Sequence, residues 1–304
     1  MTDLHPRLQV LQAKLAASPL TRIHDPELTD RQLELWIKRD DLLHSIISGN
    51  KWRKLKYILN HALRSGADSI VSMGGAYSNH LHALAFTGKA LGLKTTGYIR
   101  GERPTQLNAT LKDLLDWGMA LRFVSRSDYR QLRDYKTPDS LPDLQGGQYW
   151  LPEGGATDLA LQGVAELVDE IEIGFDTLAV ACGTGTTLAG LLSSPLTHRA
   201  IGVAALNGGD FLSEDVEQLL NKQGMSSHAN WQILIDHHFG GFAKTTPALL
   251  RFMDDFQQRY GIELEPIYTG KLLFALYDLI RQGYFPVGQR IVAIHTGGLQ
   301  GKRN

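Results

Sequence analysis

Short apolar runs alternate with longer stretches of helical period along this chain, and this alternation limits the possible folds most strongly. Residues 178–181, for example, are apolar throughout, which is typical of a parallel strand covered by helices on both faces. The pattern predicts strands at residues 69–73, 94–99, 120–124, 177–182, 200–206, 232–236 and 290–294. It predicts helices at residues 51–65, 80–91, 105–117, 158–170, 186–192, 246–260 and 270–282. We therefore expect an α/β protein with parallel sheets flanked by helices.

Charge and cysteine content narrow the functional class. The 304 residues include 31 basic and 32 acidic side chains, a balance that offers no electrostatic footprint for nucleic acid or an anionic membrane. No apolar run approaches the roughly 20 residues that cross a bilayer, and the N-terminus has no continuous apolar segment typical of a signal peptide. Cys182 is the single cysteine, so an intramolecular disulfide is excluded. We expect a cytoplasmic enzyme with a small-molecule ligand, and neither nucleic acid nor a membrane as partner.

The segment 48–55 combines a turn with the start of a helix. Gly49 and Asn50 favour the turn, and Asn50 is predicted to cap the helix. Lys51 falls in the first helical turn, where the positive end of the helix dipole disfavours an ammonium group. A neutral amine or an imine suits that place, and Schiff-base chemistry requires a lysine of lowered pKa. The alternative is a surface lysine at the head of a basic run that continues with Arg53, Lys54 and Lys56.

Two glycine-containing turns follow predicted strands. The first, Gly74-Gly75, leads into Ser78, Asn79 and His80, at the strand end where open parallel sheets bind ligands. An ordinary turn with a helix cap is the alternative for this segment. The second turn combines glycines that allow close approach with hydroxyls at the start of a helix, as in an anion site, and consists of Gly183, Thr184, Gly185, Thr186 and Thr187. Since no Gly-Lys-Ser/Thr element follows and the GxGxxG fingerprint is incomplete, a single phosphate monoester is the simplest occupant.

Further candidates lie near the C-terminus. Tyr268 precedes a predicted helix and Thr296 follows a predicted strand, and either side chain can face a ligand. Adjacent His237 and His238 point in different directions in regular structure, and no HExxH or CxxC motif accompanies them. We expect no metal site.

Taken in order, these segments resemble the family of 1-aminocyclopropane-1-carboxylate deaminases and D-cysteine desulfhydrases. The resemblance spans residues 37–301 and rests on the motifs Gly49-Asn50-Lys51-x-Arg53-Lys54-Leu55, Gly74-Gly75-x-x-Ser78-Asn79-His80, Gly183-Thr184-Gly185-Thr186-Thr187, Tyr268-Thr269-Gly270-Lys271 and His295-Thr296-Gly297-Gly298. It implies an enzyme dependent on pyridoxal 5'-phosphate (PLP), with the tryptophan synthase β-like fold known as fold type II. It also implies a homodimer, and a smaller domain of residues 53–160 inserted into a larger PLP-binding domain of residues 1–52 and 161–304. Independently, the Pro- and Gly-rich stretch 137–155 is predicted to be a loop near a domain boundary.

The resemblance assigns a role to each candidate residue. Lys51 would form the internal aldimine and later move protons, and Ser78 would bind the substrate carboxylate or assist proton transfer. Asn79 would bond the phenolic oxygen of the cofactor, and Thr296 would face its pyridine nitrogen. The remaining assignments are substrate binding by Asn79, His80 and Tyr268, with Tyr268 also catalytic, and phosphate binding by Gly183, Thr184, Gly185, Thr186 and Thr187.

The function expected from this resemblance is α,β-elimination and deamination of a small amino acid, with D-cysteine as the first candidate. Two positions depart from the family: Ala293 stands where cyclopropane-opening deaminases carry a tyrosine, and His82 where relatives commonly carry an arginine. We therefore do not expect a true 1-aminocyclopropane-1-carboxylate deaminase. The alternatives are a PLP-dependent dehydratase or racemase for serine-like substrates, and a PLP-binding protein without catalysis. A nicotinamide oxidoreductase is disfavoured because no ribose-binding acid ends the strand after the glycine turn, where Ala204, Ala205 and Leu206 stand.

Overall fold

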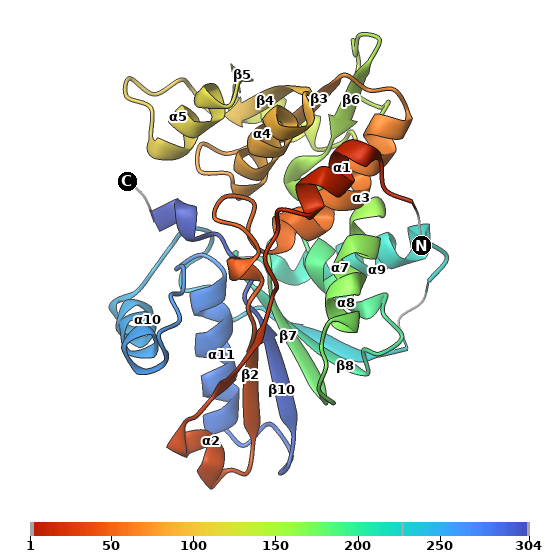
Figure 1. Ribbon diagram of the computed structural model, residues 1–304. Coiled ribbons are helices and arrows are strands. Elements are labelled where there is room, and N and C mark those ends of the chain that lie inside the picture. The colour runs from red at the N-terminus through yellow and green to blue at the C-terminus, as the bar shows by residue number, and fades with distance from the viewer. Residues whose placement is uncertain (1–2, 226–227, 303–304) are drawn as a thin grey trace.

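Two sheets organise the chain in the computed structural model, which describes residues 3–225 and 228–302 (Figure 1). The six-stranded sheet has the order β1-β2-β10-β7-β8-β9, and the four-stranded sheet has the order β5-β4-β3-β6. All neighbouring strands are parallel except the pair β1 and β2. The strands are β1 (Leu20–Ile23), β2 (Glu34–Lys38), β3 (Ser69–Gly74), β4 (Lys94–Arg100), β5 (Met119–Val124), β6 (Gln148–Leu151), β7 (Thr177–Cys182), β8 (Arg199–Ala204), β9 (Asn230–Leu234) and β10 (Arg290–Ile294).

Helices cover both faces of each sheet. Helices α7 to α9 pack on one face of the six-stranded sheet, and α10 and α11 pack on the other. In the four-stranded sheet, α3, α4 and α5 pack on one face and α6 packs on the opposite face. The α-helices are α1 (Pro6–Gln12), α2 (Pro26–Asp30), α3 (Asn50–Arg64), α4 (Asn79–Leu91), α5 (Ala109–Asp116), α6 (Arg126–Leu132), α7 (Leu159–Asp169), α8 (Thr186–Leu192), α9 (Leu212–Lys222), α10 (Pro247–Tyr260) and α11 (Thr269–Arg281). Short 3₁₀ segments are η1 (Asp40–Leu42), η2 (Glu153–Gly155), η3 (Gly209–Phe211) and η4 (Leu299–Lys302). Over the described residues, every helix is too short or too polar to span a bilayer.

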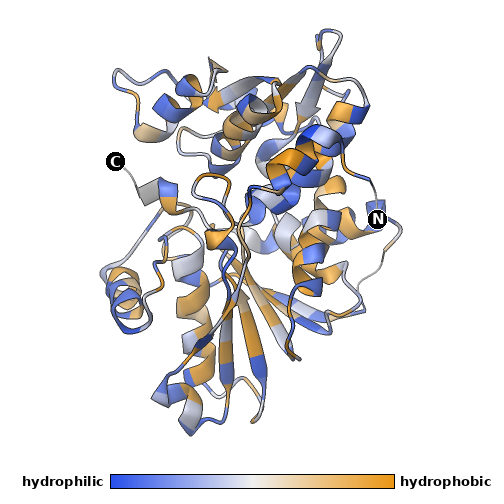
Figure 2. Cartoon of the chain, viewed as in Figure 1, coloured by the Kyte–Doolittle hydropathy of each residue, from blue (hydrophilic) through white to orange (hydrophobic). Residues whose placement is uncertain are grey.

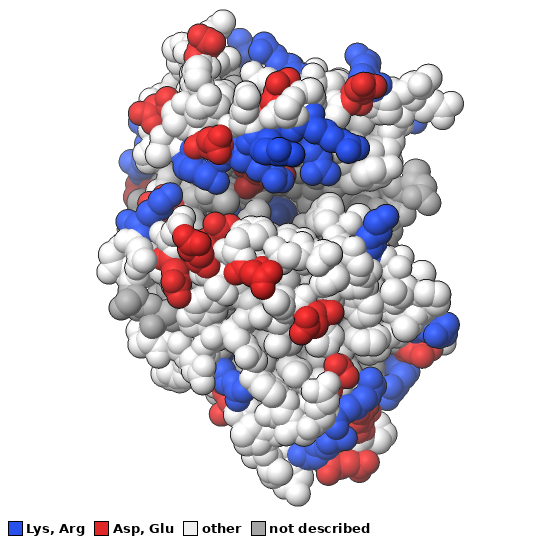
Figure 3. Space-filling view, turned by 180° about the vertical axis from the view of Figure 1, so that it is seen from behind, with Lys and Arg blue, Asp and Glu red and all other residues white. Residues whose placement is uncertain are grey.

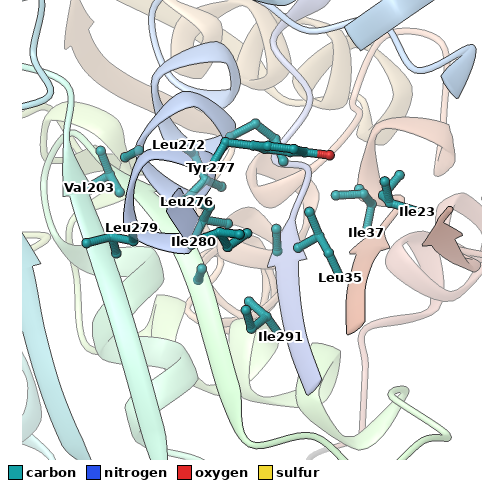
Figure 4. Packing of buried hydrophobic residues seen from close by; sticks show 14 of the residues in the cluster. Ile23, Leu35, Ile37, Val203, Leu272, Leu276, Tyr277, Leu279, Ile280 and Ile291 are labelled. Carbon is teal, nitrogen blue, oxygen red and sulfur yellow. The ribbon is translucent and has the colours of Figure 1, made fainter. Parts of the chain in front are cut away.

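Burial on both faces explains the continuous apolar strands. On β10, Ile291 and Ala293 pack toward α10 and α11, whereas Val292 and Ile294 pack toward α7 to α9. Figure 4 shows the hydrophobic cluster that includes Ile291, in which side chains of α11 lie over the strands. Figure 2 shows that hydrophobic residues are concentrated on the strands and on the covered sides of the helices. The α/β class with parallel sheets flanked by helices is therefore confirmed.

Helix α3 is buried along most of its length, including its basic residues. The guanidinium of Arg53 donates to Asp40 at 2.9 and 3.1 Å and to Glu170 at 2.7 Å, and Lys56 donates to Glu166 at 2.6 Å. These ion pairs join α3 to η1 on one side and to α7 on the other. The basic run is thus not a surface feature, because Arg53, Lys54 and Lys56 are all buried.

Every predicted strand and helix is present, and most boundaries shift by one or two residues. The largest shift is at α5, which begins at Ala109 because Asn108 caps it by accepting the N–H of Leu111 at 2.8 Å. Two expectations were wrong. The stretch 137–155 is not only a loop, since it contains β6, which pairs with β3. Asn50 does not cap α3, since Gly49 occupies that position and no side chain accepts a bond there. The division into domains of residues 53–160 and 1–52 with 161–304 stays a prediction.

The contact between α3 and α7 depends on a glycine. A Cβ atom added at Gly163 would lie 2.0 Å from the carbonyl oxygen of Arg53, so the two backbones touch where the side chain is missing. We predict that Gly163→Ala lowers the free energy of unfolding by about 1–3 kcal/mol, because the helices must separate. Gly146→Ala is the control, since a Cβ there meets nothing within 4 Å. Equal midpoints of the two variants in urea unfolding would contradict the prediction.

Candidate active site

The segment that carries Lys51 lies directly against the loop after β10. Gly49 has a φ of +66°, and a Cβ atom there would lie 1.9 Å from the carbonyl oxygen of Thr296. Gly297 has a φ of +72°, and a Cβ atom there would lie 2.6 Å from the hydroxyl of Ser48. Both glycines are required by their backbone conformation and by the close approach. The first and last motifs of the sequence are therefore in backbone contact.

A side-chain bond connects the same segment to the glycine turn after β7. The amide of Asn50 donates to the Thr187 hydroxyl at 2.9 Å, across 137 residues of sequence. Within the turn, Gly185 is left-handed, with a φ of +67°, and the hydroxyls of Thr184 and Thr186 lie 2.9 Å apart. Three threonine hydroxyls and the first amides of α8 thus gather beside Lys51, which gives an environment suited to an anion.

The turn after β3 contributes Ser78 and Asn79. Ser78 caps α4 by accepting the N–H of Leu81 at 3.2 Å, which leaves its hydroxyl proton available. The amide nitrogen of Asn79 would lie 2.9 Å from a Cβ atom at Gly298, and Asn79 accepts a bond from Gln300 at 2.5 Å. Both residues therefore meet the loop after β10.

His80 and His82 take positions beneath this turn. The His80 ring is buried and lies 2.9 Å from the hydroxyl of Ser72 on β3. His82 is also buried, pairs with Asp113 at 2.9 Å and packs edge-on against Trp117. His82, which stands where relatives commonly carry an arginine, is thus paired with a residue of α5.

Tyr268 lies against the glycine turn after β7. A Cβ atom at Gly183 would approach its phenol oxygen to 3.2 Å. Burial, and then the charges of Glu265 and Glu153, raise the pKa of Tyr268 and so keep the phenol protonated. Glu265 is itself buried, and its carboxylate accepts the N–H groups of Ile267, Tyr268 and Thr269 at 2.8, 2.7 and 2.6 Å. It fixes the backbone on which Tyr268 stands.

Lys51 and Lys54 are two cations of α3 without a counter-ion. Neither amine makes a hydrogen bond or ion pair within residues 3–225 and 228–302. Burial lowers the pKa of Lys51 to about 8 although its side chain keeps some exposure, and burial followed by the charge of Lys51 lowers the pKa of Lys54 well below its usual value. Uncompensated buried cations are costly, so this arrangement favours binding of an anion.

The structure brings most of the predicted site residues together. Gly49, two residues before Lys51, touches Thr296, and Asn79 lies against Gly298, so these segments meet at the loop after β10. Around the glycine turn that contains Gly183 and Gly185 lie Thr184, Thr186, Thr187 and Tyr268. Ser78 lies beside Gly74, and only the His80 side chain turns away, toward Ser72. Their roles remain predictions.

Sequence reasoning missed three charged residues at the site. Lys54 lies one turn after Lys51, so helical spacing was the signal that could have found it. Glu265 gave no signal, since its partners are backbone amides. Lys271 is fully buried, where it donates to the carbonyls of Ala205, His238 and Gly241 at 2.8–2.9 Å, and only its place in the Tyr-Thr-Gly-Lys motif marks it.

No metal site was expected at His237 and His238, and both residues are among those that the structure describes. His237 lies 3.0 Å from Asp278. Across residues 3–225 and 228–302, no group of three or more His, Cys, Asp or Glu side chains is placed to hold a metal ion.

Comparisons with known proteins agree with this site. The family model described as "Pyridoxal-phosphate dependent enzyme" matches residues 14–297. A putative 1-aminocyclopropane-1-carboxylate deaminase of Pyrococcus horikoshii is 32% identical, over 98% of this chain and 96% of that protein. A mitochondrial bifunctional D-cysteine desulfhydrase/1-aminocyclopropane-1-carboxylate deaminase of Arabidopsis thaliana is 30% identical, over 93% of this chain and 77% of that protein. The crystal structure of an ACC deaminase homologue superposes with a TM-score of 0.77 at 27% identity, over 99% of this chain and 97% of that one.

The lowered pKa of Lys51 predicts a reactivity that can be measured directly. Because only the neutral amine is nucleophilic, we expect the acetylation rate of Lys51 to rise with pH through a midpoint of about 8, whereas a lysine in water titrates near 10.4. Competitive labelling with acetic anhydride, followed by mass spectrometry of the peptide, gives this midpoint, and the exposed Lys112 serves as the reference. A Lys51 midpoint at or above 10 would contradict the geometry of a desolvated, unpaired amine.

Proposed function

This chain belongs to the family of pyridoxal-phosphate-dependent enzymes, and we propose that it is a lyase that eliminates the β-substituent of a small amino acid, with Lys51 as the residue that holds the cofactor. The observation that carries the proposal is the pair of buried, unpaired amines of Lys51 and Lys54 beside the glycine turn. The amine of Lys51 suits covalent attachment to an aldehyde, and the amine of Lys54 suits binding of a phosphate.

The residues fit this cofactor by their chemistry. Lys51 has the lowered pKa that an amine needs in order to attack an aldehyde near neutral pH. The Gly183–Thr187 turn supplies backbone amides and the hydroxyls of Thr184, Thr186 and Thr187 for a phosphate monoester, and the nearby charge of Lys54 would neutralise it. Asn79 would hold the phenolic oxygen, and the neutral hydroxyl of Thr296 would face the ring nitrogen. When bound, pyridoxal phosphate withdraws electrons from the bonds at the α-carbon of an amino acid.

The protein side chains would select which bond breaks. Lys51 would take and return the α-proton as a neutral amine, for which its lowered pKa is suited. The free hydroxyl proton of Ser78 would bind the substrate carboxylate or assist that transfer. The protonated phenol of Tyr268 would line the substrate side and donate a hydrogen bond to the leaving group.

D-cysteine is the first substrate candidate, and its reaction with water would give pyruvate, hydrogen sulfide and ammonia. The name of the Arabidopsis relative, which combines D-cysteine desulfhydrase with deaminase, supports this choice. Ala293 on β10 is buried between two helix layers and offers no polar group, so we do not propose ring opening of a cyclopropane substrate.

Closure of the two halves of the molecule would keep water from the reaction. We propose that residues 53–160 form the smaller domain and that residues 1–52 and 161–304 form the larger. Figure 3 shows a band of Lys and Arg on the upper half facing Asp and Glu on the lower half across a hollow. Burial raises the pKa of Asp215 on α9, and the charge of Lys136 from the other half opposes that rise. Attraction between these faces supports a closing motion.

The same proposal includes the assembly and location of the enzyme. We propose a homodimer, as the family resemblance implies, located in the cytoplasm and acting on a small amino acid, with neither nucleic acid nor a membrane as partner. A single molar mass near 67 kDa, which is twice the 33.7 kDa of one chain, would be the expected result in light scattering.

The test of the function uses wild type and Lys51→Ala, each supplied with pyridoxal phosphate and then dialysed. We expect wild type to keep a visible absorption band and to release sulfide and pyruvate from one enantiomer of cysteine. Lys51→Ala should lose the band and at least about 1,000-fold in kcat, since the amine both holds the cofactor and moves the proton.

Three other outcomes are informative. Wild type without a visible band would refute the cofactor site. A band that neither enantiomer of cysteine alters, together with pyruvate formation from serine, would instead establish a serine dehydratase. A band without turnover of any small amino acid would indicate a binding protein.

A further inference from the structure

The segment 238–244, which follows β9, consists of two consecutive tight turns that we call the double turn. The N–H of Gly241 donates to the carbonyl of His238 at 3.0 Å, and the carbonyl of Gly241 accepts the N–H of Lys244 at 3.1 Å. Phe239, in the first turn, has a φ of +54°, which a bulky residue rarely adopts. Such backbone strain persists only where surrounding contacts hold it.

The amine of Lys271 binds both turns at once. It donates to the carbonyls of His238 and Gly241 at 2.8 and 2.9 Å, and to the carbonyl of Ala205 after β8 at 2.9 Å. Three acceptors at these distances require three N–H protons, so the group is an ammonium. Burial lowers the pKa of Lys271 to about 8 and the charge of Glu265 opposes the decrease, so this form predominates at pH 7. The ammonium therefore fixes the double turn relative to α11 and to the end of β8.

The double turn directs two phenylalanines at α11 and its start. Phe239 packs edge-on against Phe274, with ring centroids 4.9 Å apart, beside the hydrophobic cluster on this face of the sheet. Phe242 is 52% exposed, yet its ring packs edge-on against Tyr268 with centroids 6.1 Å apart. Tyr268 is the N-cap of α11 and precedes Lys271 by three residues. Phe242 and Lys271 thus join the double turn to the same end of α11.

Tyr268 also contacts the glycine turn of the candidate site. A Cβ atom at Gly183 would lie 3.1 Å from Cε1 and 3.2 Å from the phenol oxygen of Tyr268. The ring therefore has one neighbour in the glycine turn and another, Phe242, in the double turn. Glu265 fixes the backbone of Tyr268, whereas these two neighbours restrict its side chain.

We propose that Phe242 is a positioning residue for the reaction: its ring, held by the double turn and the ammonium of Lys271, keeps the phenol of Tyr268 against the glycine turn. This inference rests on the proposed function, in which that phenol donates a hydrogen bond to the leaving group. An edge-on contact suits this task, because aromatic rings prefer that geometry and the contact restricts Tyr268 without engaging its hydroxyl.

The first readout is the position of the Tyr268 ring, measured at pH 7 in enzyme loaded with pyridoxal phosphate. In protein with labelled tyrosine rings and glycines, we expect a nuclear Overhauser effect between Tyr268 and Gly183, assigned by its loss in Tyr268→Phe. Phe242→Leu should abolish this effect, because the aromatic contact is lost, whereas Phe242→Tyr should keep it. An effect of wild-type strength in Phe242→Leu would overturn the proposal whatever the activity.

The matched control is Phe239→Leu. It changes the other phenylalanine of the double turn, whose ring packs on Phe274 rather than on Tyr268. We expect this variant to keep the nuclear Overhauser effect of the wild type. Loss of the effect in Phe239→Leu as well would show that any change in the double turn moves Tyr268, and would contradict a specific role for Phe242.

The second readout is the dependence on the leaving group. With the preferred enantiomer of cysteine, we expect Phe242→Leu to lower kcat about 10-fold and to change KM and the visible band less than about 2-fold, since only the hydrogen bond to the leaving sulfur is misaligned. With β-chloroalanine of the same configuration the loss should be less than about 2-fold, because chloride departs without a proton donor. Phe242→Tyr, which keeps the ring, should restore kcat. Equal losses with both substrates would count against the proposal.

Lys271→Met tests whether the ammonium holds Phe242 in place. We expect this variant to lose the nuclear Overhauser effect between Tyr268 and Gly183 although Phe242 is retained, because the carbonyls of the double turn lose their common donor. A folded Lys271→Met that keeps the effect would refute the part assigned to Lys271. Since removal of a buried ammonium from three carbonyls can unfold the chain, Phe242→Leu, at an exposed residue, is the deciding variant.

Failure of this inference is distinct from failure of the proposed function. If Lys51→Ala loses the band and activity but Phe242→Leu keeps the nuclear Overhauser effect and the kcat of wild type, Phe242 has no part in the reaction and the role of Lys51 stands. If wild type has neither a visible band nor turnover, the proposed function itself falls, and the inference falls with it.

Discussion

The approach of Gly49 to the carbonyl of Thr296 is the contact on which the candidate site depends. The two backbones meet where a Cβ atom would lie 1.9 Å from the oxygen, and Gly49 has a φ that other residues rarely adopt. Because α3 starts one residue later, this contact sets where the helix begins relative to the edge of the six-stranded sheet. The bond from Asn50 to Thr187 fixes the same point against the glycine turn. Lys51 follows immediately, so its place is determined by neighbours that lie more than 130 residues away in sequence.

Helix α3 then separates two kinds of cation. Arg53 and Lys56 have carboxylate partners in Asp40, Glu170 and Glu166, and these pairs join the helix to its supports. Lys51 and Lys54, on another face, have no counter-ion among the described residues, and burial lowers the pKa of both. The ion pairs of Arg53 and Lys56 stabilise the position of the helix. The unpaired amines of Lys51 and Lys54 give that position a function, because positive charge without a partner next to a glycine turn attracts a phosphate.

The sequence predicted the parts of this structure that depend on local pattern. Continuous apolar runs identified β7 and β10 to the residue, because strands buried on both faces need apolar side chains at every position. Strands β1, β2 and β6 were missed: each is only four or five residues long, and β1 and β2 carry charged residues. The Lys51, Ser78–Asn79 and Gly183–Thr187 segments were found because each has turn chemistry beside a helix start. The burial of Lys54 arises from tertiary contacts that no local pattern encodes. The same is true of the bond to Thr187 that directs the Asn50 side chain away from capping α3.

The amine of Lys51 stays available for chemistry because no carboxylate among the described residues pairs with it. Glu265 is the buried carboxylate nearest to Tyr268 in sequence, but three backbone N–H groups occupy it. Burial, and then the charges of Lys51 and Lys54, lower the pKa of His80 well below its usual value, so its ring stays neutral. The fold therefore leaves the amines of Lys51 and Lys54 without a negative partner among the described residues, so the negative charge is left to be supplied by a ligand. A phosphate and a carboxylate, which a pyridoxal-phosphate enzyme with an amino-acid substrate must both bind, are the anions that such an arrangement requires.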